Sequence, residues 1–231
     1  MNKIGILCAG DDELAPFLPE IEGCETVRKA MLTFHCGKIA GMEAVALYSG
    51  VCKVNAAVAA QILIDHFGVD AILNAGTAGA LDPSLRVFDT VVSTESAYHD
   101  VAANILTEFH PWLPDVWFRA DEKLLAAARR AARGREDVRF GRMVSGEQFI
   151  NGEQREQIRA AFRPLTVDME TAAAAHVCHV NGIPFLAVRS VTDNADHDGA
   201  ENFEANCSRA AQLSRDLVLG ILAQLGEDGP A

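Results

Sequence analysis

Short apolar segments of strand character alternate with helical segments along most of this chain. The apolar segments, rich in Val, Ile and Leu, lie near residues 3–9, 32–38, 43–49, 70–75, 89–95, 141–145, 165–169 and 184–190. Helical spacing of apolar residues appears at 54–67, 122–132, 153–161, 171–180 and 206–225. This alternation predicts an α/β fold, with a mainly parallel sheet covered by helices.

The segments at 32–38 and 43–49 depart from this pattern, because only a short connection from Gly37 to Gly41 separates them. A connection of this length predicts an antiparallel hairpin, so the central sheet should be mixed. With 231 residues and 49% hydrophobic content, the chain can bury one full core. We therefore expect a single domain over 1–231, with 226–231 as a flexible, solvated tail.

The charge of the chain excludes some partners. Lys and Arg total 20 against 32 Asp and Glu, and the resulting net charge of -12 repels phosphate backbones and anionic membranes. No window reaches the roughly 20 apolar residues of a membrane helix, and no basic leader precedes the first strand. We expect a cytoplasmic protein that binds neither nucleic acid nor membrane.

The six cysteines are scattered and form no CxxC pair, which indicates reduced thiols. His176, Cys178 and His179 could hold zinc in principle. Positions i, i+2 and i+3 share one helix face poorly, so we favour a structural interpretation and expect no metal.

Three apolar strands end abruptly in acidic residues. They are the strand at 4–9 before Asp11-Asp12-Glu13, the strand that ends in Val167-Asp168-Met169-Glu170, and the strand that runs through Arg189 to Asp193. Ligands of α/β enzymes bind beyond the carboxyl ends of the strands. The three acidic ends therefore predict one acidic pocket.

The small residues from Asn74 to Ala80 follow the strand at 70–73. Their backbone N–H groups and the Thr77 hydroxyl can donate hydrogen bonds to an oxygen-rich ligand. A tight turn under a helix accounts for the small residues equally well. The segment matches neither a P-loop nor a G-x-G-x-x-G pattern, so it does not indicate nucleotide phosphates.

Each acidic residue at these strand ends has a structural and a chemical interpretation. Glu170 can cap a helix through the helix dipole, or it can accept hydrogen bonds from the vicinal hydroxyls of a sugar. Asp193 can be a surface charge, or it can protonate a departing purine at nitrogen 7 while Glu13 takes a proton from water. One acid for the leaving group and one carboxylate for water is the arrangement of inverting glycosidases.

Taken together, the motifs of the chain resemble the 5′-methylthioadenosine/S-adenosylhomocysteine nucleosidases of the nucleoside phosphorylase superfamily. The matching segments, in order, are 3–6, Ser49-Gly50-Val51-Cys52-Lys53-Val54, 74–79, Tyr98-His99-Asp100, Val144-Ser145-Gly146-Glu147-Gln148-Phe149-Ile150, 167–170 and 188–193. The resemblance implies one α/β domain around a mixed sheet, a homodimer whose neighbouring subunit closes the 5′ pocket, no cofactor, and a place in nucleoside catabolism and methionine salvage.

The resemblance also implies roles for individual residues. Glu13 matches the carboxylate that activates water, and Asp193 matches the acid that protonates adenine. The remaining matches are Thr77 and Arg189 near the water, Met169 and Glu170 at the ribose, Phe149 and Ile150 at the base, and Val51 and Phe203 around the 5′ substituent.

The nucleophile is the sharpest open question. Related phosphorylases carry Arg in the N-terminal loop and in the glycine-rich turn, because a phosphate dianion needs cationic partners. Here the loop reads Gly10-Asp11-Asp12-Glu13 and the turn begins with Asn74, which favours water. A purine nucleoside phosphorylase, an aminodeoxyfutalosine nucleosidase and a non-catalytic nucleoside-binding module remain alternatives. The irregular segment 98–118 leaves the preferred 5′ substituent open, 5′-deoxyadenosine included.

Overall fold

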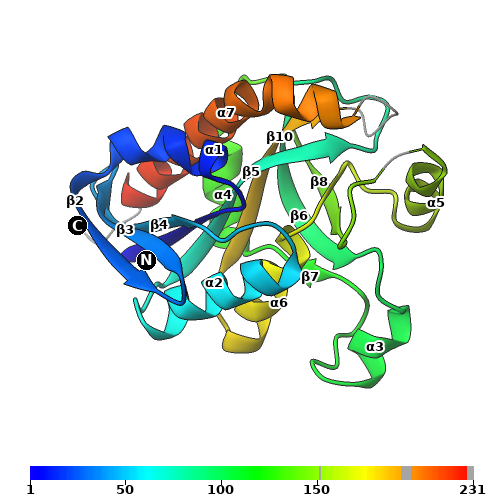
Figure 1. Cartoon of the computed structure of the whole chain (residues 1–231), viewed down its shortest axis with the longest axis horizontal. Coiled ribbons are helices and arrows are strands. Elements are labelled where there is room, and N and C mark those ends of the chain that lie inside the picture. Colours follow the sequence, from blue (N-terminus) through cyan, green and yellow to red (C-terminus); the bar gives the residue numbers. More distant parts are fainter. Residues whose placement is uncertain (151, 194–198, 228–231) are drawn as a thin grey trace.

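A mixed sheet of ten strands forms the centre of the computed structural model, which describes residues 1–150, 152–193 and 199–227 (Figure 1). The strands are β1 (Lys3–Cys8), β2 (Glu22–Lys29), β3 (Leu32–Ile39), β4 (Met42–Tyr48), β5 (Ala71–Ala80), β6 (Thr90–Tyr98), β7 (Phe118–Arg119), β8 (Val138–Ser145), β9 (Thr166–Asp168) and β10 (Phe185–Asp193).

Five of the strands close into a ring. β10 pairs in parallel with β5 and antiparallel with β6, and the circuit returns from β6 through β8 and β9 to β5. From β5 the sheet continues outward through β1, β4 and β3 to β2. Parallel and antiparallel pairs occur together, so the predicted mixed sheet is confirmed.

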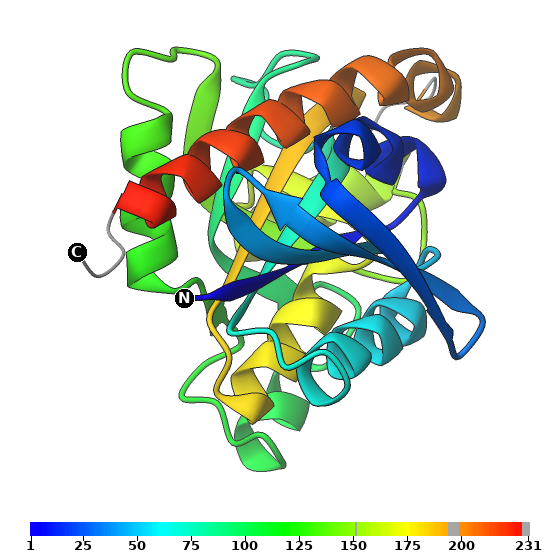
Figure 2. The same ribbon diagram turned by 90° about the vertical axis from the view of Figure 1, so that its left-hand side faces the viewer.

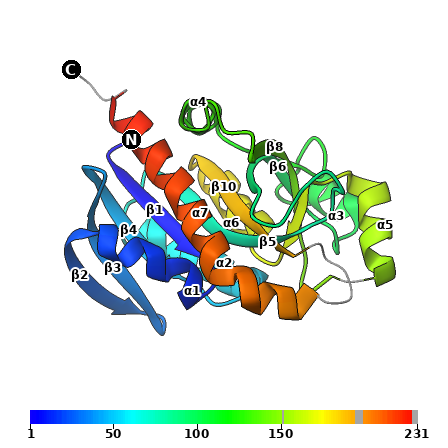
Figure 3. The same cartoon turned by 90° about the horizontal axis from the view of Figure 1, so that it is seen from above.

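Helices cover both faces of the sheet (Figures 1 and 2). They are α1 (Asp11–Leu14), the 3-10 helix η1 (Ala15–Glu20), α2 (Lys53–Asp65), α3 (Ala103–Glu108), α4 (Glu122–Ala131), α5 (Gly152–Phe162), α6 (Thr171–Asn181) and α7 (Gly199–Glu227). α4 and α7 pack on one face and α2 and α6 on the other, while α3 and α5 lie at the end opposite β2 and β3 (Figure 3).

The alternation of side chains along each central strand supplies the two cores. In β1, Ile4 and Ile6 pack into the cluster under α4 and α7, whereas Leu7 packs into the cluster that includes Leu63 of α2. Successive side chains of a strand point to opposite faces, so a central strand must be apolar on both. This is why β1 and the first half of β10 read as nearly continuous apolar runs.

The predicted hairpin is confirmed as β3 and β4, which pair antiparallel across Ala40 and Gly41. Both turn residues have positive φ, 50° and 79°, as a type I′ turn requires.

Several elements differ from the sequence-based expectations. The glycine-rich segment from Asn74 is part of strand β5 and not a turn, because β10 pairs with it as far as Gly79. Strands β2 and β7 and helices α1 and α3 were not expected. Gly226 and Glu227, expected to belong to a flexible tail at 226–231, are the last residues of α7; residues 228–231 lie outside the described part.

Strand direction positions the site. β1, β5 and β10 run parallel, so their carboxyl ends lie at the same edge of the sheet. None of the helices in the described part of the chain is long and apolar enough to cross a bilayer.

Candidate active site

A cavity of about 460 Å³ opens at this edge of the sheet. All ten residues singled out in the sequence line it: Glu13, Val51, Thr77, Phe149, Ile150, Met169, Glu170, Arg189, Asp193 and Phe203. The three acidic strand ends do meet in one pocket. The expectation that these residues lie together is therefore confirmed, whereas their chemical roles remain predictions.

Glu13 lies in α1, directly after β1, and is only 4% exposed. Its Oε2 accepts hydrogen bonds from the backbone N–H groups of Ala9 at 2.7 Å and Gly10 at 3.2 Å. Its Oε1 accepts from the N–H of Thr77 at 2.7 Å and from the Thr77 hydroxyl at 2.8 Å. Every one of these partners donates, so Glu13 faces the site as a fixed acceptor.

Gly76 makes this position of Glu13 possible. A Cβ atom at Gly76 would lie 2.4 Å from Glu13 Oε1 and 2.6 Å from Oε2. No side-chain carbon fits at such distances, so the strand residue beside the carboxylate has to be glycine.

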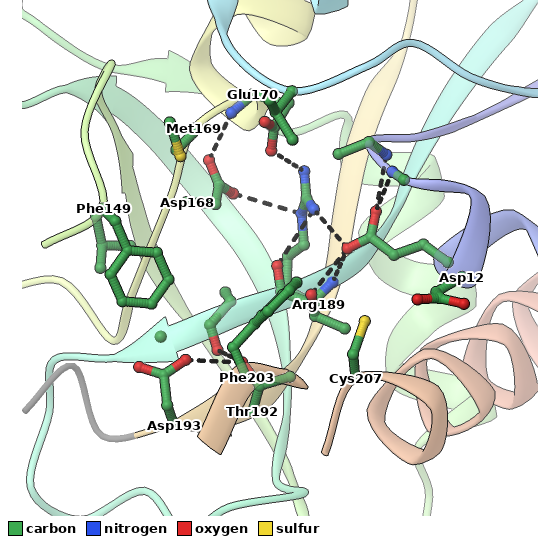
Figure 4. Close-up of a pocket in the computed structure, with 18 of the residues that line it drawn as sticks. Asp12, Phe149, Asp168, Met169, Glu170, Arg189, Thr192, Asp193, Phe203 and Cys207 are labelled. Carbon is green, nitrogen blue, oxygen red and sulfur yellow. Dashed lines mark hydrogen bonds and ion pairs between the residues drawn. The ribbon is translucent and has the colours of Figure 1, made fainter. Parts of the chain in front are cut away.

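Arg189 lies in the middle of β10 and is 1% exposed. Its guanidinium forms ion pairs with Glu13 at 3.6 Å, Asp168 at 3.4 Å and Glu170 at 3.5 Å (Figure 4). Burial by itself lowers the pKa of Arg189, but these carboxylates outweigh it, and the pKa is raised. One buried cation thus holds three carboxylates at the floor of the cavity.

The strand β5 supplies two further partners of Arg189. Asn74 Oδ1 accepts from Nη2 at 2.8 Å, and the Thr77 carbonyl accepts from Nη1 at 3.2 Å. Asn74 in turn donates to the carbonyl of Leu7 at 2.7 Å. These bonds satisfy the buried amide of Asn74, whose structural role the sequence did not indicate.

Glu170 is 4% exposed and accepts a hydrogen bond from the backbone N–H of Cys52 at 2.8 Å. Burial raises its pKa to about 7, and the nearby carboxylates Asp168 and Glu13 add to this, while Arg189 and the Cys52 N–H act in the opposite direction. A carboxyl group with this pKa changes its charge near neutral pH.

Asp168 organises the end of β9. Its Oδ1 accepts from the Ser145 hydroxyl at 2.5 Å and from the N–H groups of Glu170 at 3.1 Å and Thr171 at 3.0 Å, and its Oδ2 bonds the Thr171 hydroxyl. Asp168 therefore accepts from the first backbone N–H of α6 and fixes the turn that carries Glu170. We assigned it no role from the sequence, although it belongs to one of the acidic strand ends.

Asp193 is the last residue of β10 and is 2% exposed. The Thr192 hydroxyl donates to its Oδ2 at 2.8 Å, and Asn206 of α7 holds the Thr192 carbonyl at 2.9 Å. Figure 4 shows Asp193 and Phe149 toward one side of the cavity and Asp12 and Cys207 toward the other. The cavity therefore has an aromatic end with one acid and a second, more acidic end.

Apolar side chains line the open parts of the cavity. Phe149 is 45% exposed, Val51 57% and Phe203 36%, whereas Ile150 is buried. Exposed aromatic and aliphatic groups inside a pocket are typical of surfaces that a ligand covers.

Sequence reasoning gave no role to several further lining residues, among them Asp12, Gln148, Glu204 and Cys207. Burial raises the pKa of the Cys207 thiol to about 11, with Glu13 and Asp12 adding to the shift. Asp12 and Gln148 stood within quoted segments, whereas for the start of α7 the resemblance pointed only to Phe203.

The described lining carries seven carboxyl side chains and a single guanidinium, that of Arg189. Because Arg189 already pairs with three of those carboxylates, it is poorly placed to bind another anion. The electrostatics of the cavity suit a neutral or cationic ligand.

The chain is similar to known proteins over nearly its whole length. The family profile described as phosphorylase superfamily matches residues 3–223. The 5′-methylthioadenosine/S-adenosylhomocysteine nucleosidase of Geobacillus kaustophilus is 38% identical over 227 residues, covering 96% of this chain and 97% of the relative.

Two solved structures have the same fold. The 5′-methylthioadenosine/S-adenosylhomocysteine nucleosidase of S. pneumoniae, solved with the transition-state inhibitor MT-ImmA, gives a TM-score of 0.91 at 32% identity, covering 96% of this chain and 99% of that chain. The futalosine hydrolase of Helicobacter pylori gives 0.87 at 30% identity, covering 96% and 97%.

The profile match spans nearly the whole chain, so the chain belongs to the phosphorylase superfamily, and its ring-closed mixed sheet is the fold of the two solved structures. Within that superfamily, the chain belongs to the 5′-methylthioadenosine/S-adenosylhomocysteine nucleosidase family, whose members are N-glycosyl hydrolases.

Proposed function

We propose that this protein hydrolyses the N-glycosidic bond of 5′-methylthioadenosine and S-adenosylhomocysteine, releasing adenine and the 5-substituted ribose. The observation that carries the proposal is the pair Glu13 and Asp193, buried at different strand ends of one cavity in a chain 38% identical to a nucleosidase of that name. Hydrolysis needs an activated water on one side of the sugar and an acid at the leaving group on the other.

Glu13 takes the role of the base in this proposal. Its backbone and Thr77 partners fix the carboxylate, so it can accept a proton from an attacking water without reorganising. Arg189 neutralises part of the local negative charge and so allows Glu13 to lie near two other carboxylates.

Asp193 takes the role of the acid. A proton shared between its carboxyl group and nitrogen 7 of adenine makes the base a better leaving group. Phe149 would stack on the same base, the backbone of Ile150 would contact its edge, and Figure 4 places Phe149 on the same side of the cavity as Asp193.

Glu170 and Met169 would hold the ribose, with Glu170 accepting hydrogen bonds from its vicinal hydroxyls. As positive charge develops on the sugar ring, the carboxylates of the cavity stabilise it. Val51 and Phe203 offer apolar surface to the 5′ substituent. This reaction requires no metal or organic cofactor.

Water is favoured over phosphate as the nucleophile by the excess of carboxylates among the described lining residues. The test is incubation with 5′-methylthioadenosine with and without phosphate, with identification of the sugar product. Free methylthioribose at a rate independent of phosphate supports hydrolysis. A sugar 1-phosphate would establish phosphorolysis instead, and tight binding without cleavage would favour a binding module.

An aminodeoxyfutalosine nucleosidase is the second candidate, supported by the structural likeness to a futalosine hydrolase. Comparing kcat/KM for the adenine nucleosides S-adenosylhomocysteine, 5′-methylthioadenosine, 5′-deoxyadenosine and aminodeoxyfutalosine ranks the substrates. The first proposal requires one of the two sulfur-containing nucleosides to be at least about tenfold better than aminodeoxyfutalosine.

We also propose that the protein works as a homodimer. Val54 and Val51 at the start of α2 are 73% and 57% exposed, and Phe109 and Trp112 after α3 are 58% and 66% exposed. Large apolar side chains at such exposure are typical of an interface. Light scattering should give twice the chain mass of 24.8 kDa, and Val54→Glu with Trp112→Asp should halve it.

A cytoplasmic location and a place in methionine salvage complete the proposal. The six free cysteines fit a reducing compartment. Cell fractionation tests the location, and accumulation of methylthioadenosine in cells that lack the protein tests the pathway.

A further inference from the structure

The sequence motif Tyr98-His99-Asp100 and the neighbouring Lys53 lie outside the groups assigned to chemistry. Tyr98 ends β6, and Lys53 begins α2. Both lie beside the 146–150 loop, which links β8 to α5 and carries Phe149 and Ile150 into the cavity.

Asp100 joins the loop to α2. Its two carboxylate oxygens each accept a hydrogen bond from Lys53 Nζ at 3.0 Å, and its Oδ2 also accepts from the backbone N–H of Glu147 at 3.0 Å. The backbone N–H of Lys53 donates to Glu147 Oε1 at 3.0 Å. These hydrogen bonds thus connect three segments that are distant in sequence: the start of α2, the residues after β6 and the first residues of the loop.

The other two residues of the motif, Tyr98 and His99, also contact Lys53 and the loop. The His99 ring packs so closely on Gly146 that a Cβ atom there would lie 2.2 Å from Nε2. The Lys53 ammonium lies 5.3 Å from the centre of the Tyr98 ring, a cation–π contact.

The residue before Lys53 extends this linkage to the sugar side of the cavity. Cys52 donates its N–H to Glu170, and its backbone has φ 79° and ψ 166°, a region in which side chains other than glycine are strained. Strain of this kind persists only where the surroundings hold it. One turn therefore contacts both the loop and the proposed ribose-binding carboxylate.

We propose that Lys53 and Asp100 are positioning residues, which hold the 146–150 loop in its adenine-binding geometry and register it against Glu170. The proposal rests on the function proposed above. Without the Lys53–Asp100 ion pair the loop samples other conformations, and part of the binding free energy of the substrate is then spent on ordering the loop.

The ionisation of Asp100 supports this role. Burial tends to raise its pKa, but the hydrogen bonds from Lys53 and from the Glu147 N–H outweigh burial and lower it. Asp100 therefore stays charged, and the ion pair is present, throughout the neutral range.

The experiment measures kcat and KM for 5′-methylthioadenosine, and the Kd of adenine by calorimetry, in the full-length protein. The variants are Lys53→Met, Asp100→Asn, the double variant and the charge-conserving Lys53→Arg. The control is Arg215→Met, because the Arg215–Glu20 pair has the same 21% exposure of the cationic side chain but lies away from the loop.

We expect both single variants to raise KM and the adenine Kd about tenfold with kcat changed less than about threefold, which is the pattern of lost uniform binding. The double variant should be no worse than either single one, because both remove the same link. Lys53→Arg should recover most of the affinity, and the control should leave KM within about twofold.

Unchanged KM and Kd in the single variants, or independent losses that multiply in the double variant, would overturn the proposal. A loss of kcat without a change in KM would do so as well. If the unaltered protein releases no adenine, the proposed function is contradicted. The role of Lys53 and Asp100 is then tested by the Kd of adenine alone.

Discussion

Replacing Glu170 with Gln should stabilise the protein at alkaline pH even though it damages the proposed sugar site. The carboxyl group is 4% exposed, and its pKa rises from 4.5 to about 7 in the folded protein. A shift of about 2.5 units at 1.36 kcal/mol per unit corresponds to about 3 kcal/mol.

The direction follows from which state binds the proton. Between pH 4.5 and about 7 the unfolded chain ionises Glu170 while the folded protein keeps it protonated, so the stability contributed by the group falls as pH rises. Above pH 7 the loss is complete. Gln carries no charge at any pH, so the Glu170→Gln variant does not lose this contribution to its free energy of unfolding as pH rises.

Urea unfolding at fixed protein concentration measures the effect. The free energy of unfolding of Glu170→Gln, minus that of the unaltered protein, should increase by about 3 kcal/mol between pH 4 and pH 8. Glu153→Gln, at an exposed position of α5, is the matched control for the change of a carboxyl group into an amide. A difference for Glu170→Gln that does not change between pH 4 and pH 8 would refute the reasoning.

Three further changes test the site. Asp193→Asn should lower kcat by about 10²- to 10⁴-fold with ligand affinity within a few-fold, as seen by calorimetry; an unaltered kcat removes Asp193 from the mechanism. Gly76→Ala brings a Cβ atom to 2.4–2.6 Å from the Glu13 carboxyl and should lower kcat at least about tenfold, with the displaced carboxylate visible in a crystal structure; normal activity would contradict the fixed-acceptor role. Arg189→Met leaves three buried carboxylates without their cation and should lower the free energy of unfolding by about 3–5 kcal/mol in urea, and a loss below about 1 kcal/mol would count against the ion-pair cluster.

Much of the site was predictable because its residues occur at strand ends. Apolar runs that stop at charge mark the carboxyl edge of the parallel strands, where Glu13 and Asp193 lie. Glu170 also follows such a run, but it reaches the cavity from β9, which runs antiparallel to β5. The resemblance of ordered motifs then identified Phe149 and Phe203, which carry no such local signal. Both line the same cavity as the three acids.

The elements that the sequence did not predict correctly have physical explanations. β2 is exposed along its whole length, so it lacks the apolar alternation by which a strand is recognised. Gly76 and Gly79 suggested a turn, but pairing with β10 and β9 on either side keeps the segment extended. Tertiary contacts override local propensity there.

Asp168 and Asn74 were missed for another reason. Each is defined by partners remote in sequence, since Asp168 bonds Ser145 and pairs with Arg189, and Asn74 bonds Leu7. The order and direction of the strands bring such partners together, and the spacing of apolar residues in the sequence does not predict it.

The outermost strand has a consequence for the behaviour of the protein in a crowded cell. β2 is the end of the sheet order, and a terminal strand offers its backbone to any other extended chain. Its eight residues include Glu22, Glu25, Arg28 and Lys29, all exposed, and a shift of pairing interrupts it between Glu22 and Glu25. Charge and irregularity together make this edge a poor template for β-aggregation, although it is long and open.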